Sequence, residues 1–156
     1  MTTRRVVLIA MVAALYVVLT IGIAPLSFGP VQFRVSEALK VLVLFDPFLA
    51  LGIGIGTFLA NLASPFVGPW ELIWMPLTDI LGGLLAWWSY KMLRKAVLSS
   101  AVYAITTALS VAVMLQAMGV GWFWFSLLPV GASELAILIG GIPLMLPLRK
   151  WIDECR

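Results

Sequence analysis

Long stretches without a single charged residue constrain this chain more than any other feature. Residues 6–33 and residues 96–133 contain no Asp, Glu, Lys or Arg. The 156 residues are 63% hydrophobic and 11% charged, with a mean hydropathy of +1.11. A soluble domain of this size cannot hide so much apolar surface, because its surface-to-volume ratio is too high. We therefore expect an all-α, multi-pass membrane protein with a single integral membrane domain over residues 1–156.

The composition also excludes several kinds of chemistry. Histidine is absent and cysteine occurs once, at Cys155. His-ligated metal sites, His general bases and intrachain disulfides are therefore impossible. The net charge of +3 comes from basic residues beside apolar segments, which indicates membrane topology rather than nucleic-acid binding. We expect no cofactor, no metal and no enzymatic activity.

The apolar runs predict the membrane-spanning helices. Four are plain in the sequence, and we take the first as a retained span, because its apolar run is too long for a typical signal peptide. Residues 36–64 form either one span or a hairpin of two, and Asp46-Pro47 interrupts them, since the residue before proline disfavours helix. The predicted helices cover approximately residues 6–24, 34–45, 47–64, 71–90, 96–118 and 126–148.

The positions of the basic residues decide whether residues 36–64 cross the membrane once or twice. The basic groups lie at residues 4–5, 91–95 and 149–150 and at Arg156, and the positive-inside rule places all of them in the cytoplasm. That placement requires residues 36–64 to cross twice. The prediction is six helices, with both termini cytoplasmic and the protein in the cell membrane. Helix 34–45 is then short, about 20 Å long at ~1.5 Å per residue against ~30 Å of hydrocarbon, so we expect its connector to enter the protein and form part of a site.

Four acids stand out because ionisable groups within a bilayer are costly and usually face a cavity or a partner. The topology places Glu37, Glu71 and Glu134 toward the outer face, with Asp79 about 12 Å deeper than Glu71 along its helix. Local explanations compete with a functional one. Glu37 can pair with a base three residues away, Arg34 or Lys40, and Glu71 can be a first-turn acid favoured by the helix dipole. Glu134 and Asp79 have no basic neighbour in sequence.

Aromatic residues crowd the same predicted outer end. Most suit the aromatic belt of a membrane protein, but the segment "PWELIW" places Glu71 between Trp70 and Trp74. A carboxylate accepts two parallel N–H donors, and aromatic rings stack on a heterocycle or attract a cation. This combination favours a planar, nitrogen-rich ligand, for which Trp122 is a further stacking candidate.

Small residues suggest two close helix contacts. On the third predicted helix, Gly52, Gly56, Ala60 and Ala63 form a stripe that internal packing explains. On the first, Ala10 and Ala14 lie in the cytoplasmic half and suit either internal packing or the docking of another subunit. Ser36 and Lys40, four apart, permit a Ser-Lys nucleophile pair, but no other residue supports an intramembrane enzyme.

Three segments resemble the QueT family, namely "GPVQFRVSEAL" (29–39), "FLANLASPFVG" (58–68) and "GASELAILIGGIPL" (131–144). The resemblance runs over nearly the whole chain. It implies a substrate-binding S component of an energy-coupling factor transporter that takes up queuosine precursors. It further implies six helices, a ligand site near the outer face, docking through Ala10 and Ala14, and two kinds of partner: a transmembrane coupling subunit and two ATPases.

The resemblance implies a ligand such as 7-aminomethyl-7-deazaguanine, with N–H donors on one edge and a cationic arm. One carboxylate would accept the edge and another would pair with the ammonium. The candidate residues are Glu37, Glu71, Glu134 and Asp79 as acids, Gln32, Arg34 and Asn61 for the ring carbonyl, and Trp70, Trp74 and Trp122 for stacking. The alternatives are an S component for another flat vitamin-like ligand and an autonomous secondary carrier.

Overall fold

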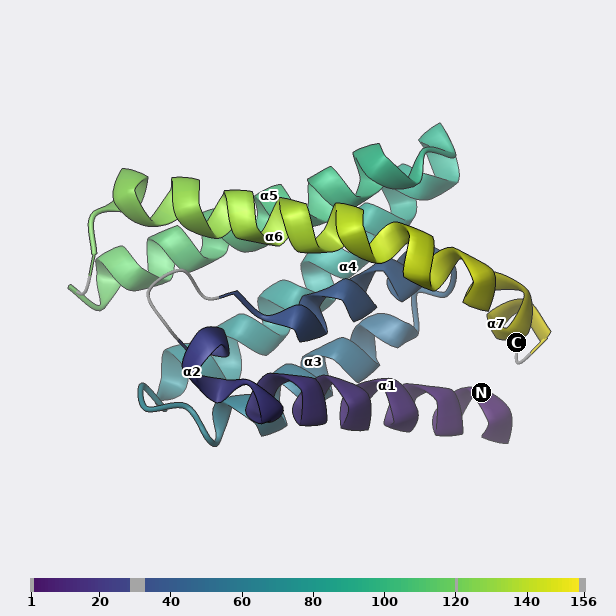
Figure 1. Ribbon diagram of the computed structural model, residues 1–156, viewed down its shortest axis with the longest axis horizontal. Coiled ribbons are helices and arrows are strands. Elements are labelled where there is room, and N and C mark those ends of the chain that lie inside the picture. The colour runs from purple at the N-terminus through teal and green to yellow at the C-terminus, as the bar shows by residue number, and fades with distance from the viewer. Residues whose placement is uncertain (1, 29–32, 120, 155–156) are drawn as a thin grey trace.

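The computed structural model describes residues 2–28, 33–119 and 121–154, and these residues form a bundle of helices (Figure 1). Within them no strand occurs. The elements are α1 (Thr3–Gly22), α2 (Ala24–Ser27), η1 (Val35–Leu44), α3 (Leu49–Asn61), η2 (Trp70–Trp74), α4 (Met75–Leu93), α5 (Ala96–Ala117), α6 (Phe123–Met145), η3 (Leu146–Leu148) and α7 (Arg149–Glu154).

Successive long segments run in alternating directions, so the bundle has two chemically distinct ends (Figure 1). The start of α1, the η1–α3 turn, the α4–α5 connection and α7 lie at one end, which we call the basic end. The segments at this end contain Arg4, Arg5, Lys91, Arg94, Lys95, Arg149 and Lys150. At the opposite end, which we call the aromatic end, lie α2, the α3–α4 connection and the α5–α6 turn (Figure 1). These segments and the helix ends beside them contain Phe28, Trp70, Trp74, Trp122, Trp124 and Phe125.

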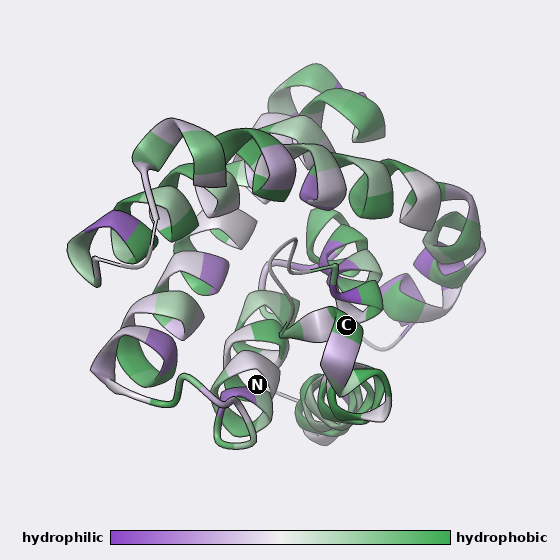
Figure 2. Ribbon diagram, turned by 60° about the vertical axis from the view of Figure 1, so that its left-hand side comes forward, coloured by the Kyte–Doolittle hydropathy of each residue, from purple (hydrophilic) through white to green (hydrophobic). Residues whose placement is uncertain are grey.

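Four helical stretches in the described part of the chain are long and apolar enough to cross a membrane. They are Thr3–Gly22, Trp70–Leu93, Ala96–Ala117 and Phe123–Glu154. Hydrophobic residues cover most of their length (Figure 2). The two other segments that run along the bundle are short: α3 has 13 residues and η1 has 10. Length alone therefore does not establish the predicted six crossings.

The short segment η1 occupies the centre of the bundle, where it packs against α1, α3, α4, α5 and α6. It is a 3₁₀ helix, which rises ~2.0 Å per residue and therefore reaches about as far in 10 residues as an α-helix does in 13. Nearly every side chain from Ser36 to Leu44 is buried. Its central position explains why this segment is apolar on all sides apart from a few polar groups that find partners inside the protein.

The break predicted at Asp46-Pro47 is present between η1 and α3. The Asp46 carboxylate accepts a hydrogen bond from the Phe48 backbone N–H at 3.1 Å and forms an ion pair with Arg5 Nε at 3.1 Å. The Arg5 guanidinium also lies over the Phe48 ring. These contacts hold the η1–α3 turn against the first helical turn of α1.

Glycines allow α3 to lie directly against α1, which confirms internal packing for Gly52 and Gly56. Ala60 is buried as well, whereas Ala63 lies after the end of α3 and is exposed. A Cβ on Gly52 would meet the Ile9 carbonyl oxygen at 2.8 Å, and one on Gly56 would meet Tyr16 Cβ at 2.7 Å. Close approach of this kind is the usual role of small residues between membrane helices. It also brings Tyr16 of α1 into the polar centre of the bundle.

Candidate functional site

The polar centre of the bundle is built around the ammonium group of Lys40, a side chain that is 0% exposed. Lys40 Nζ forms ion pairs with Glu37, with Asp79 Oδ1 at 2.8 Å and with Glu134 Oε1 at 2.7 Å. It also donates to Thr107 Oγ1 at 3.4 Å. We call Lys40, Glu37, Asp79 and Glu134 the Lys40 cluster.

Neighbouring hydroxyl groups complete the hydrogen bonding of two of these acids. The Tyr16 hydroxyl donates to Glu37 Oε1 at 2.6 Å, and the Thr57 hydroxyl donates to Asp79 Oδ2 at 2.5 Å. The Tyr103 hydroxyl donates to the Asp79 backbone carbonyl at 2.6 Å. Together with Lys40 and its acids, these side chains come from α1, η1, α3, α4, α5 and α6, so the cluster connects every long segment of the bundle.

The helix type of η1 places its ionisable residues on one face. A 3₁₀ helix has 3.0 residues per turn, so Glu37 and Lys40 lie one above the other, and Arg34 precedes them by the same interval at the N-cap. All three side chains are buried. Charged groups without such partners would be too costly in a membrane-embedded core.

A second group of buried polar side chains lies nearer the aromatic end and is incompletely paired. Asn61 Nδ2 donates to the Glu71 backbone carbonyl at 2.8 Å, and Arg34 Nε donates to the Ser27 carbonyl at 3.3 Å. Within the described residues, however, no hydrogen-bond partner is found for Glu71 Oε2, Asn61 Oδ1, Arg34 Nη1 or Ser27 Oγ. Glu71 and Asn61 are 3% and 0% exposed, so these vacant hydrogen-bonding positions lie inside the protein.

The backbone around Glu71 departs from an α-helix. Residues Trp70–Trp74 form a π-helical turn, in which the Met75 N–H reaches back to the Trp70 carbonyl. Pro76 follows and has no N–H to give to the carbonyl four residues earlier, which favours this wider turn. Single π-helical turns are frequent at functional sites.

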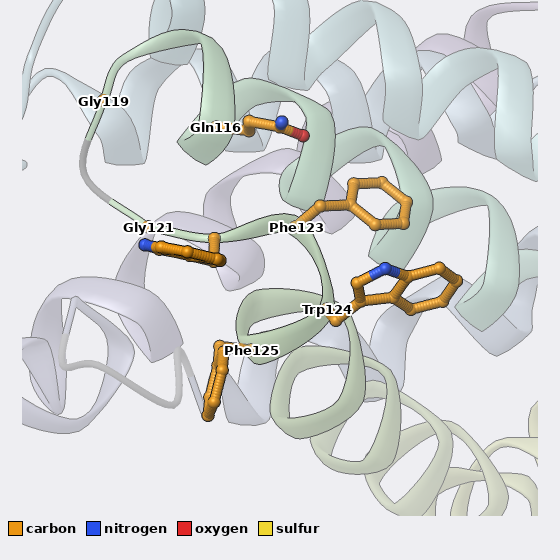
Figure 3. A pocket seen from close by; sticks show the side chains of 7 residues that line it. Gln116, Gly119, Gly121, Phe123, Trp124 and Phe125 are labelled. Carbon is orange, nitrogen blue, oxygen red and sulfur yellow. The ribbon is translucent and has the colours of Figure 1, made fainter.

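The predicted stacking residues lie at the surface rather than in the polar centre. Trp70 and Trp74 contact each other edge to face, with ring centroids 5.7 Å apart, and both are exposed. Trp122 lines an open cavity of about 560 Å³ at the α5–α6 turn, together with Gln116, Gly119, Gly121, Phe123, Trp124 and Phe125. At the start of α6, Phe123 and Trp124 lie side by side, edge to face with ring centroids 5.1 Å apart, and Phe125 points away from them (Figure 3). Exposed aromatic residues at one end suit a membrane interface.

Comparison with known proteins assigns the chain to a family. The model of the QueT transporter family matches residues 6–150. The chain belongs to the QueT transporter family. It is accordingly a membrane transport protein and not an enzyme.

One relative carries a functional name. The queuosine precursor transporter QueT of Lactococcus lactis subsp. cremoris (strain MG1363) is 44% identical over 64 residues, which cover 40% of this chain and 38% of that protein. The alignment thus spans well under half of the relative's length. No solved structure matches the chain.

For this QueT family member, the structure brings together some of the predicted site residues. Glu37, Asp79 and Glu134 meet at Lys40, and Asn61 meets Glu71. The local pairing of Glu37 with Lys40 is confirmed. Gln32 lies outside the described residues.

Two further predictions concern the helix surface and the Ser-Lys pair. Ala10 and Ala14 are both exposed on α1, whereas Ala13 between them is buried. Ser36 Oγ lies 2.7 Å from Thr20 Oγ1, while Lys40 is surrounded by carboxylates. The two residues have separate partners, so they do not form the Ser-Lys pair that their spacing permits.

The sequence does not reveal the central role of Lys40 or the contributions of Tyr16, Thr57 and Thr107. Spacing alone indicates Lys40 only as a local partner of Glu37. The signal available in the sequence is the excess of acids over bases within the apolar segments, which indicates that a buried base such as Lys40 can pair with more than one acid.

Proposed function

We propose that this chain is the substrate-binding subunit of an energy-coupling factor transporter in the cell membrane, and that it takes up a queuosine precursor. The observation that carries the proposal is the family match over residues 6–150. The name of the Lactococcus relative supports the choice of substrate. The absence of a nucleotide-binding motif from the sequence supports the assignment of ATP hydrolysis to separate chains.

The proposal includes six crossings, with both termini in the cytoplasm and the aromatic end outside. The alternating segment directions and the collection of basic residues at one end support it, because positive residues favour the cytoplasmic side. The pair η1 and α3 would cross as a short hairpin. The 3₁₀ geometry of η1 adds reach to a segment that has few residues.

The substrate site is proposed to lie nearer the aromatic end of the bundle than the Lys40 cluster does. Support comes from the buried, incompletely paired groups of Arg34, Asn61 and Glu71. A deazaguanine offers N–H donors on one edge and a ring carbonyl, which are the complements of a carboxylate and a guanidinium. The proposed set that contacts the substrate is Gln32, Arg34, Asn61, Trp70, Glu71, Trp74 and Trp122, and Glu37, Asp79 and Glu134 are proposed to complete the site from the Lys40 cluster.

The proposed partners are a transmembrane coupling subunit and two ATPases, which would dock on α1. The small, exposed side chains of Ala10 and Ala14 support this surface, because small residues permit close helix contact in a membrane.

Uptake by cells tests this function. Cells that lack their own import of queuosine precursors should accumulate labelled 7-aminomethyl-7-deazaguanine when this chain is produced with a coupling subunit and the ATPases. They should accumulate none when the chain is produced alone. Uptake by the chain alone would instead identify a secondary carrier, and uptake of a different flat vitamin only would replace the proposed substrate.

A further inference from the structure

The buried acids of the bundle differ in whether a cationic side chain of the protein already forms an ion pair with them. In the Lys40 cluster, Glu37 uses one oxygen for Tyr16 and the other for Lys40, and Asp79 uses one for Thr57 and the other for Lys40. The two oxygens that face Lys40 lack hydrogen-bond geometry but lie within ion-pairing distance of it.

Lys40 itself has little capacity for further partners. An ammonium group has three N–H donors, and here it faces three carboxylates and the Thr107 hydroxyl. A substrate amine that sought Glu37 or Asp79 would have to displace this fully buried ammonium group. Removing one member of a buried ion pair leaves uncompensated charge, which is strongly unfavourable.

Glu71 has a different environment. None of the ion pairs formed among the described residues involves it, and its Oε2 has no hydrogen-bond partner there. Asn61, whose amide N–H₂ donates to the Glu71 backbone carbonyl, likewise leaves its Oδ1 without a donor. Two buried acceptors from adjacent elements therefore lack donors, and a buried acceptor without a donor is costly unless a ligand supplies one.

We propose that Lys40 divides Glu37, Glu71, Asp79 and Glu134 into two functional sets; the other buried acid, Asp46, pairs with Arg5 at the basic end. Glu71 and Asn61 recognise the N–H edge of a planar heterocyclic substrate and determine specificity. Glu37, Asp79 and Glu134 are positioning residues, which act through Lys40 by fixing η1, α4 and α6 relative to one another. This division rests on the proposed function for the identity of the substrate, but not for the partition of the acids.

Binding by the purified full-length chain tests the first set. Glu71→Gln, which preserves shape but removes the charge, should weaken binding of 7-aminomethyl-7-deazaguanine by about tenfold or more, the loss expected for a charge-assisted hydrogen bond. Asn61→Ala should weaken binding in the same direction. Wild-type affinity in Glu71→Gln overturns the proposal.

Thermal unfolding without any ligand tests the partition and controls for misfolding. Because Lys40 contacts Glu134 and not Glu71, the effects of Lys40→Met and Glu134→Gln should be non-additive, whereas those of Lys40→Met and Glu71→Gln should add. Additivity in the first pair, or strong coupling in the second, overturns the division. If the wild-type chain binds no deazaguanine, the proposed substrate fails, and this cycle still decides the partition.

Discussion

At the scale of single residues, Lys40 makes a charged interior compatible with an apolar bundle. Among the described residues, the acids Glu37, Glu71, Asp79 and Glu134 share that interior with two buried bases, Arg34 and Lys40, while a fifth buried acid, Asp46, pairs with Arg5 at the basic end. Three of the acids converge on Lys40. One side chain thus carries most of the electrostatic compensation.

Removing this side chain should therefore destabilise the protein. We expect Lys40→Met to lower the free energy of unfolding by about 3–5 kcal/mol, the typical cost of breaking a buried ion pair on one side. Denaturant titration in detergent micelles measures this loss. Lys150→Met is the matched control, because Lys150 is exposed and exposed substitutions change stability by about 0.5 kcal/mol at most. Equal effects of the two substitutions would show that the cluster contributes no stability.

The acids of the site could be predicted from the sequence, but their grouping could not. Glu37 and Lys40 are three residues apart, so their pairing was predictable from local spacing. Lys40 and Glu134 are 94 positions apart, and no periodicity connects them. Only the packing of η1 between α4 and α6 brings these groups together.

At the scale of elements, the contact of α1 with α3 depends on the absence of side chains at two positions. We expect Gly56→Ala to destabilise the bundle by about 1–3 kcal/mol, because its Cβ would lie 2.7 Å from Tyr16 Cβ. Gly140→Ala in α6 is the control, since nothing lies within 4 Å of a Cβ there. Thermal unfolding should separate the two variants, and equal melting temperatures would mean that α1 moves aside without cost.

The second prediction at the scale of elements concerns the outward face of α1. Replacing Ala10 or Ala14 by leucine should abolish coupled uptake while leaving substrate binding by the purified chain unchanged, because only the contact with a partner is blocked. Ala136→Leu is the control, as Ala136 is an exposed alanine of α6. Unimpaired uptake in the α1 variants would show that Ala10 and Ala14 do not contact a partner subunit and only face lipid.

Charge-free runs and Asp46-Pro47 were sufficient to predict the main helical segments and the break after η1. The helix types were not predictable. The 3₁₀ helix η1 is enclosed by five neighbouring helices, and the π turn at Glu71 comes just before Pro76, which has no N–H to donate. Both forms depend on tertiary contacts that single-sequence patterns do not contain.

At the scale of the whole molecule, the proposed topology requires η1 and α3 to cross the membrane as a pair. In a Cys155→Ser background, we expect Val67→Cys, at the α3–η2 connection, to react with a membrane-impermeant maleimide in intact cells. Phe48→Cys, at the η1–α3 turn, should react only after permeabilisation. Val67 and Phe48 are 51% and 42% exposed, so accessibility within the protein does not distinguish them. Labelling of Phe48→Cys in intact cells would contradict the double crossing.

The central claim is that this single chain holds the binding site for a queuosine precursor. Calorimetric titration of the purified chain, without partners, with 7-aminomethyl-7-deazaguanine tests it most directly. We predict saturable binding with one site per chain, and competition by a second deazaguanine but not by adenine. The absence of heat and of saturation in a folded preparation would contradict the claim.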